Sequence, residues 1–247
     1  KIAKLKDLSQ LSFEECTINA ENIGVMVDDT MHNIRFKNCN LTKEQIATLD
    51  LSGNKLSSLD ISGSQLDGLD IIEGQQENLS SLHISDTKVS DISVLADFTK
   101  LGEISAENCG ITDISSLANL EKLTTLRLAG NEIESLKPFE NLTKLDRIDL
   151  SRNKLKNLDG LEKSLELSTL VADDNEIENI DGITNATRLF AVSLKNNNMN
   201  NEKIITIKFI STLHFIIYTS KVNHFIYYTI FPVNLQYFCL FCNFMVQ

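Results

Sequence analysis

The chain contains 247 residues, and its 34 acidic and 23 basic side chains give a formal net charge of −11. Because phosphate contacts need a basic surface, this balance argues against nucleic acid as a partner. The charge is unevenly distributed: residues 201–247 contain three lysines and a single glutamate, and the strongly acidic part of the chain ends before them.

Residues 1–78 contain apolar repeats of irregular length. Two units end in a cysteine after the same alternation, Leu8-x-x-Leu11-x-Phe13-x-x-Cys16 and its counterpart from Met31 to Cys39. Between residues 49 and 71 the period falls to ten, with apolar residues five apart, which is also typical of a pentapeptide β-helix. We favour shortened repeats of one continuous solenoid, because Leu49-x-Leu51-x-x-Asn54 has the form of a strand followed by a turn.

Residues 79–200 repeat with a strict period of 22. The repeats open on leucines, namely Leu79, Leu101, Leu123, Leu145, Leu167 and Leu189. In the repeat at Leu123, Leu126 and Leu128 alternate as in a strand, and the apolar residues that follow return at threefold spacing. Threefold spacing favours a 3₁₀ or extended return over a full α-helix. Each unit can bury its apolar face only against its neighbours, so the sequence predicts a stack of repeats.

A polar residue marks the turn after each predicted strand. The regular repeats carry Asn131, Asn153, Asn175 and Asn197 there. A buried amide can bond the backbone groups that a tight turn leaves unpaired, so we expect a structural asparagine ladder. Cys16, Cys39 and Cys109 occupy the same position, which favours a structural thiol over a disulfide or a metal ligand. The phenylalanines of the repeats are expected in the core, namely Phe13, Phe36, Phe98, Phe139 and Phe190.

These repeats resemble the 22-residue leucine-rich repeats of bacterial internalins, most clearly at Ile111–Leu120 and Asn131–Phe139. Asn175–Ile183 is about equally similar to the SDS22-like regulatory subunits of protein phosphatase 1. The resemblance implies an α/β fold, a right-handed leucine-rich-repeat solenoid with a parallel β-sheet on its concave face. The convex face would carry 3₁₀, short helical or extended returns.

The search for a catalytic or metal site finds no candidate. The four histidines form no H-x-x-x-H motif, and the chain has no nucleophile elbow or phosphate-binding glycine loop. Adjacent acids such as Asp173 and Asp174 point to opposite faces of a strand, which favours a solvated surface over metal ligation. We therefore expect no enzyme activity, no cofactor and no metal.

The outward residues of successive strands should align into columns on the concave face. One column is His83, Ser105, Arg127, Asp149, Val171 and Ser193. Arginine is common at binding hot spots, so the predicted partner-binding residues are Arg127, Arg147, Asp149, Arg152, Glu103 and Asp173. The alternative is an ordinary wet face whose opposite charges pair across repeats.

Residues 201–247 form a hydrophobic and aromatic tail that does not continue the repeat. Its Phe, Ile, Tyr, Asn and Lys content favours a lost reading frame or read-through. A membrane segment at residues 222–247 is the second interpretation, because this stretch has no Asp, Glu, Lys or Arg, although Pro232 and polar residues interrupt it. A folded cap is the third.

The resulting prediction is a non-catalytic module that binds a protein or peptide on its concave face. Resemblance to internalins implies an extracellular or cell-surface location within a larger bacterial protein. The alternatives are a cytoplasmic SDS22-like subunit that docks an enzyme such as a phosphatase, and a structural spacer. No signal peptide is recognisable after Lys1, where a basic start is followed by no uninterrupted apolar run.

Overall fold

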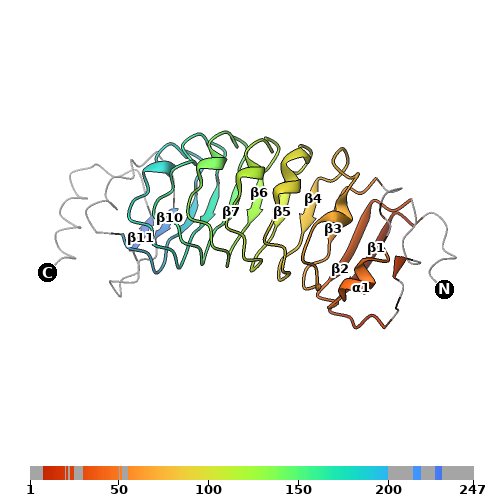
Figure 1. The fold of residues 1–247 in the computed structure, drawn as a ribbon. Coiled ribbons are helices and arrows are strands. Elements are labelled where there is room, and N and C mark those ends of the chain that lie inside the picture. The colour runs from red at the N-terminus through yellow and green to blue at the C-terminus, as the bar shows by residue number, and fades with distance from the viewer. Residues whose placement is uncertain are drawn as a thin grey trace, which may run out of the picture.

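The computed structural model describes residues 8–19, 21, 23–24, 30–49, 51 and 55–199, and also two short strands in the tail. The repeats form one open, parallel, nine-stranded sheet in which sequence order and spatial order coincide. Its strands are β1 (Gln10–Glu14), β2 (Asn33–Lys37), β3 (Ser58–Asp60), β4 (Ser81–His83), β5 (Glu103–Ser105), β6 (Thr125–Arg127), β7 (Arg147–Asp149), β8 (Thr169–Val171) and β9 (Ala191–Ser193). Figure 1 shows these strands following one another along the long axis, so the predicted leucine-rich-repeat solenoid is confirmed.

Short helices occupy the return segments between the strands. The 3₁₀ helices are η3 (Asp70–Ile72), η4 (Ser93–Asp97), η5 (Ser115–Leu117), η6 (Lys137–Phe139) and η7 (Asp181–Ile183). The α-helix α1 (Lys43–Ile46) begins at a capping box, in which Thr42 and Gln45 each accept a hydrogen bond from the backbone N–H of the other. The threefold apolar spacing therefore predicted the 3₁₀ returns correctly.

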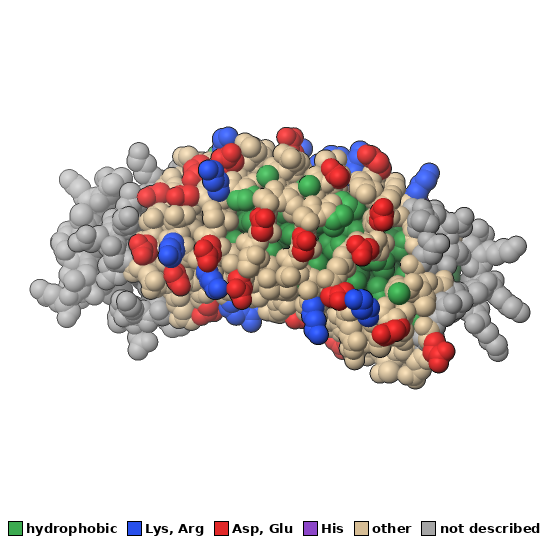
Figure 2. Space-filling model, in the orientation of Figure 1, with side chains coloured by type: hydrophobic (Ala, Val, Ile, Leu, Met, Phe, Trp, Pro, Cys, Tyr) green, Lys and Arg blue, Asp and Glu red, His purple; other side chains and the backbone are tan. Residues whose placement is uncertain are grey.

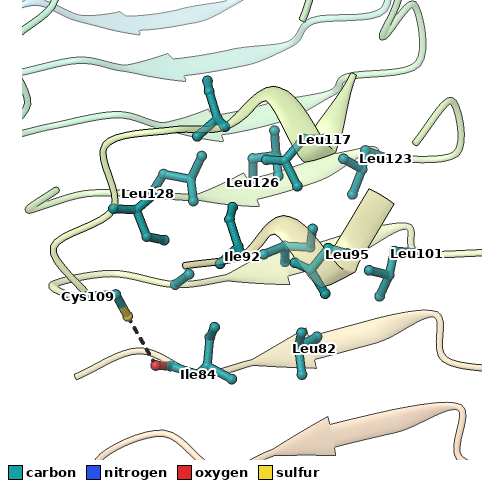
Figure 3. Packing of buried hydrophobic residues seen from close by; sticks show 14 of the residues in the cluster. Leu82, Ile84, Ile92, Leu95, Leu101, Cys109, Leu117, Leu123, Leu126 and Leu128 are labelled. Carbon is teal, nitrogen blue, oxygen red and sulfur yellow. Dashed lines mark hydrogen bonds between the residues drawn. The ribbon is translucent and has the colours of Figure 1, made fainter. Parts of the chain in front are cut away.

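The core is a continuous stack of aliphatic side chains between the sheet and the returns. In Figure 3, Leu82 and Leu126 from the strands and Leu95 and Leu117 from the 3₁₀ segments point toward one another. All four are fully buried. Burying a leucine stabilises the fold by about 1.5–3 kcal/mol, and each repeat can realise this only against its neighbours.

The strand register shows how the irregular N-terminal repeats join the regular ones. Leu11 pairs with Ile34 after 23 residues, Ile34 with Leu59 after 25, and Leu59 with Leu82 after 23, before the constant period of 22 begins. The strand of the third repeat is therefore Ser58–Asp60. Our interpretation of Leu49–Asn54 as a strand and turn was wrong, because Leu49 and Leu51 are buried in the return of a lengthened repeat.

A buried glutamine supports this lengthened return. Gln75 is fully buried; its amide nitrogen donates to the carbonyl of Leu51 at 2.6 Å, and its oxygen accepts from the N–H of Leu56 at 3.1 Å. The equivalent position one repeat later is the apolar Phe98. The amide satisfies two backbone groups that the irregular loop would otherwise bury without partners.

The asparagine ladder has the predicted structural role. Asn131 donates from Nδ2 to the carbonyls of Ala106 and Leu128, and its Oδ1 accepts from the N–H groups of Cys109 and Ile111. Asn153, Asn175 and Asn197 repeat the pattern. The buried Cys109 donates its thiol to the carbonyl of Ile84 at 3.2 Å, as drawn in Figure 3, and Cys39 is also buried. Cys16, which follows β1 in the first repeat, is exposed and not buried like the other two cysteines.

Two of the expected core aromatics depart from the prediction. Phe36, Phe98 and Phe139 are fully buried, but Phe13 is only partly buried and stacks on Phe36 with ring centroids 5.7 Å apart. Phe190 is 56% exposed, so placing it in the core was wrong. It occupies the residue just before β9, a position that serine or threonine fills in several earlier repeats and that is exposed or partly exposed in most of them.

The described part of the tail consists of β10 (His214–Ile217) and β11 (Ile226–Thr229). They pair antiparallel in a separate two-stranded sheet, and β10 lies close to β9. The sheet therefore gains no tenth parallel strand from these residues, in agreement with the end of the repeat pattern in the sequence. The proposed boundary at residue 200 stays a prediction, and most of residues 222–247 lie outside the described residues.

Candidate functional site

The concave face consists of the outward side chains of the nine parallel strands. The register aligns its central column as Ser12, Arg35, Asp60, His83, Ser105, Arg127, Asp149, Val171 and Ser193. Neighbouring members of the column are one strand spacing apart, about 4.8 Å. The predicted column from His83 to Ser193 is therefore correct, and it extends through three further strands toward the N-terminus.

The concave face is hollowed over β1 to β6. The hollow has a volume of about 660 Å³, and all but two of its lining residues, Leu11 and Ile34, are polar. Its charged lining residues are Arg35, Lys37, Asp60, Asp86, Glu103, Glu107 and Arg127. Serines 58, 62, 85 and 105 also line it. Such a surface offers hydrogen bonds and charge, without the large apolar anchors of a tight protein interface.

The basic side chains at the N-terminal end of the hollow are already paired. Arg35 lies 3.3 Å from both Glu14 Oε1 and Asp60 Oδ2, and Lys37 Nζ lies 3.0 Å from Glu14. The hydrogen bond from the Lys37 ammonium, with the charge of Arg35 beside it, lowers the pKa of the Glu14 carboxyl. Asp60 also accepts a hydrogen bond from the Ser62 N–H at 3.1 Å. These contacts restrict the positions of the charged side chains.

Of the six predicted binding residues, the hollow contains two. Arg127 and Glu103 both line it and form an ion pair with each other across β6 and β5. Arg147 and Asp149 project from β7, beyond the hollow; Arg147 lies 3.8 Å from Asp146, and Asp149 accepts hydrogen bonds from Ser151. The sheet therefore places Arg127 beside Asp149, but most of the predicted cluster is satisfied by its own neighbours.

Asp173 and Arg152 lie farther along the same surface. Asp173 accepts hydrogen bonds from the Ser193 hydroxyl at 2.6 Å and from the Lys195 N–H at 2.8 Å. Arg152 lies at the rim, with a φ of 56°, in a position where every repeat adopts the left-handed conformation. Its guanidinium donates to Asn108 Oδ1 at 3.3 Å, two repeats away.

Gly130 makes that long contact possible. Gly130 is the equivalent residue in the repeat that lies between those of Asn108 and Arg152, and its φ is 72°. A Cβ at Gly130 would lie only 2.0 Å from Asn108 Oδ1 and 3.4 Å from Arg152 Nη2. The glycine therefore leaves the space in which the arginine reaches the asparagine, in addition to relieving the backbone strain of a positive φ.

The sequence reasoning missed Arg35, Asp60 and His83 as members of one charged hollow. The repeat from Met31 to Cys39 already put Arg35 outward between Ile34 and Phe36, so its position on this face was open to prediction. Asp60 was not, because the strand of its repeat had been placed at Leu49–Leu51. Correct pairing of that repeat required the buried contacts of the lengthened return.

The hollow has no arrangement that indicates catalysis. Ser81 Oγ lies 2.8 Å from His83 Nε2, but Asp60, the neighbour of His83 in β3, is bonded to Arg35 and Ser62. Within the part of the chain that the structure describes, no three His, Cys, Asp or Glu side chains are placed to hold a metal ion. Among the described helices, none is long and apolar enough to cross a membrane. In Figure 2, acidic and basic side chains are interspersed over the surface shown.

Comparison with known proteins supports the assignment of the repeats. Residues 121–163 match the family described as "Leucine Rich repeats (2 copies)". Among curated protein sequences, the chain has no significant match. Internalin C2 of Listeria monocytogenes has a similar structure, with a TM-score of 0.63 and 26% identity over 73% of this chain and 76% of that protein.

Two further structures share the fold. The internalin InlF of Listeria monocytogenes has a TM-score of 0.75 and 22% identity over 90% of this chain and 65% of its own. A leucine-rich-repeat protein of Leptospira interrogans has a TM-score of 0.66 and 20% identity over 84% of this chain and 59% of its own. The chain thus spans less than two thirds of each of these two structures. The repeats, the register and these similarities together show that the chain is a leucine-rich-repeat solenoid similar to the internalins.

Proposed function

We propose that the chain binds a protein or peptide on its concave face, without catalysis. The observation that carries the proposal is the alignment of outward polar side chains over nine consecutive strands, hollowed between β1 and β6. A parallel solenoid sheet presents such columns to solvent over a long distance, which suits an extended or convex partner. Arg127 and Glu103 form the C-terminal end of the hollow, and Arg147, Asp149, Arg152 and Asp173 continue the polar surface beyond it.

The proposed context is a surface-exposed or secreted bacterial protein of which this solenoid is one segment. The similarity to internalin C2 and InlF supports this context. The alternative is an intracellular SDS22-like regulatory subunit. Fractionation of the source cells, with detection by an antibody against the repeats, distinguishes the two: the first places the protein in the wall or culture supernatant, and the second in the cytosol.

Two charge-matched double variants test binding at the concave face. The first, Arg127→Ala with Arg147→Ala, removes two positive charges from the sheet. The control, Lys122→Ala with Lys144→Ala, removes two positive charges from exposed residues that come before strands β6 and β7. Both proteins, with the wild type, are immobilised and exposed to an extract of proteins from the surroundings of the source cells, and the retained proteins are quantified by mass spectrometry.

We expect retention of a specific partner to change about tenfold or more for the arginine variant, because charged side chains at an interface contribute on the order of 1–2 kcal/mol each. Retention falls if the arginines contact acidic groups of the partner, and it rises if the partner is basic. The lysine variant should retain the partner as well as the wild type does. Equal retention by all three proteins would show that the concave face is not the binding surface. Melting curves of the three proteins check that each is folded.

A further inference from the structure

The charges in the hollow are not balanced. The lining cations all have acidic partners: Arg35 pairs with Glu14 and Asp60, Lys37 with Glu14, and Arg127 with Glu103. Asp86 and Glu107 line the same hollow, and neither forms an ion pair within the described part of the chain. Two carboxylates are thus left without a cation at one side of the hollow.

Asp86 and Glu107 lie in adjacent repeats. The Asp86 N–H donates to the carbonyl of Glu107 at 2.8 Å, which joins the turns that follow β4 and β5. Their carboxylates make only neutral contacts: Asp86 accepts from the Asn108 amide at 2.8 Å, and Glu107 accepts from the Ser85 hydroxyl at 3.4 Å. Each carboxylate has two oxygens and can accept several further hydrogen bonds. The pair therefore retains both its negative charge and its accepting capacity.

Ser62 adds a hydrogen-bonding group to the hollow. It lines the hollow and is only 6% exposed. Its backbone N–H is bonded to Asp60, but its hydroxyl makes no hydrogen bond with any described residue. The hydroxyl oxygen stays accessible from the hollow, so it can donate or accept a hydrogen bond when a ligand enters. Ser85 occupies the equivalent position in the next repeat, and its hydroxyl accepts from the Glu107 N–H at 3.1 Å.

We infer that the hollow takes an extended basic peptide segment, with a lysine or arginine side chain between Asp86 and Glu107. This inference rests on the proposed binding function and specifies its partner. An acidic segment does not suit the hollow, because the cations there are already paired. It would meet the carboxylates of Glu14, Asp60 and Glu103 as well as those of Asp86 and Glu107. A second copy of this chain is disfavoured as occupant, because its formal net charge is −11. The hollow spans six strands, about 24 Å at one strand spacing each, which matches roughly seven residues of extended peptide.

The test uses the full chain and fluorescein-labelled peptides of alternating lysine and serine, glutamine and serine, or glutamate and serine. Binding is followed by fluorescence anisotropy at low and at physiological salt. We expect the lysine peptide to bind at least about tenfold more tightly than the glutamine peptide, and the glutamate peptide not to bind. Added salt should weaken the lysine peptide, since part of its affinity is electrostatic.

Asp86→Asn with Glu107→Gln is the informative variant. Asparagine already occupies the position of Asp86 in three other repeats with the same left-handed backbone, at residues 38, 108 and 196, so the change fits the fold. The control is Glu121→Gln with Glu140→Gln, which removes the same net charge from exposed residues of the return segments. We expect the first variant to weaken the lysine peptide about tenfold and the control to leave it unchanged.

Three outcomes would overturn the inference. They are equal binding of the lysine and glutamine peptides, preferential binding of the glutamate peptide, and equal weakening by the two double variants, which would indicate attraction to the net charge alone. If any of these occurs while the variant with Arg127→Ala and Arg147→Ala still differs from the wild type in partner retention, the concave face binds a partner of other chemistry. If that variant retains the partner as the wild type does, the proposed function itself fails.

Discussion

Replacing Asn153 by alanine tests whether the ladder stabilises the solenoid. Asn153 is 8% exposed and makes four hydrogen bonds: Oδ1 accepts from the Ile133 N–H, and Nδ2 donates to the carbonyls of Leu128, Leu150 and Ser151. These losses are unequal. Leu128 still receives the Nδ2 of Asn131, and Leu150 that of Asn175, whereas the Ile133 N–H loses its acceptor.

The orphaned N–H costs about 1–3 kcal/mol, and each carbonyl that keeps another donor loses about 0.5 kcal/mol. We therefore expect Asn153→Ala to lower the free energy of unfolding by about 2.5–4.5 kcal/mol. For a chain of this size, that corresponds to a melting temperature roughly 5–18 °C lower. Thermal unfolding followed by circular dichroism, with urea unfolding as a second measurement, gives both quantities.

Asn119→Ala is the matched control, because Asn119 is exposed in the return that follows η5 and has no hydrogen bond through its side chain. We expect its melting temperature to stay within about 1 °C of the wild type, in line with a neutral surface substitution. If the two variants melt at the same temperature, the ladder amides do not stabilise the repeat, and the structural explanation of this position fails.

Two further predictions concern buried side chains. Leu126→Ala should lower the free energy of unfolding by about 2–5 kcal/mol, because Leu126 is fully buried between Ile104 and Ile148 in neighbouring strands. The control is Thr143→Ala at an exposed position, and an equally small change in melting temperature for both variants would contradict the assigned register. Burial raises the pKa of the Cys109 thiol, so folding favours the protonated thiol, and this contribution to stability is lost only as the pH rises above the ordinary thiol pKa. Iodoacetamide at pH 8 should therefore modify the exposed Cys16 well before Cys109 in the folded protein and both at similar rates in urea, as read by peptide mass mapping. Cys109→Asn should leave the melting temperature unchanged or raise it. In the wild type the Val89 N–H has only a 3.4 Å contact with the Thr87 hydroxyl, and the new amide oxygen can accept a hydrogen bond from it. A lower melting temperature would show that this turn requires the thiol.

The fold was predictable because its determinants are local and repeated. Leu126, Asn131 and the threefold returns recur with a fixed period, and a repeat that contacts only its neighbours must place equivalent residues in equivalent positions. The columns of the concave face follow from the same period, since side chains alternate between the two faces of a strand. For this reason the central column from His83 to Ser193 could be read correctly from the sequence alone.

Tertiary structure decided the places where the period fails and where charges find partners. The position of β3 depends on a lengthened return that Gln75 holds by buried hydrogen bonds, and nothing in the local pattern of Leu49–Leu51 reveals it. Likewise, the sequence shows that Arg127 and Glu107 share a face. It does not show that Arg127 forms an ion pair with Glu103 while Glu107 has no cationic partner among the described residues. Pairing of side chains depends on distances of a few ångströms between repeats and on rotamers. Those are set by packing across the whole stack, whereas the period of the sequence sets only the order of the residues.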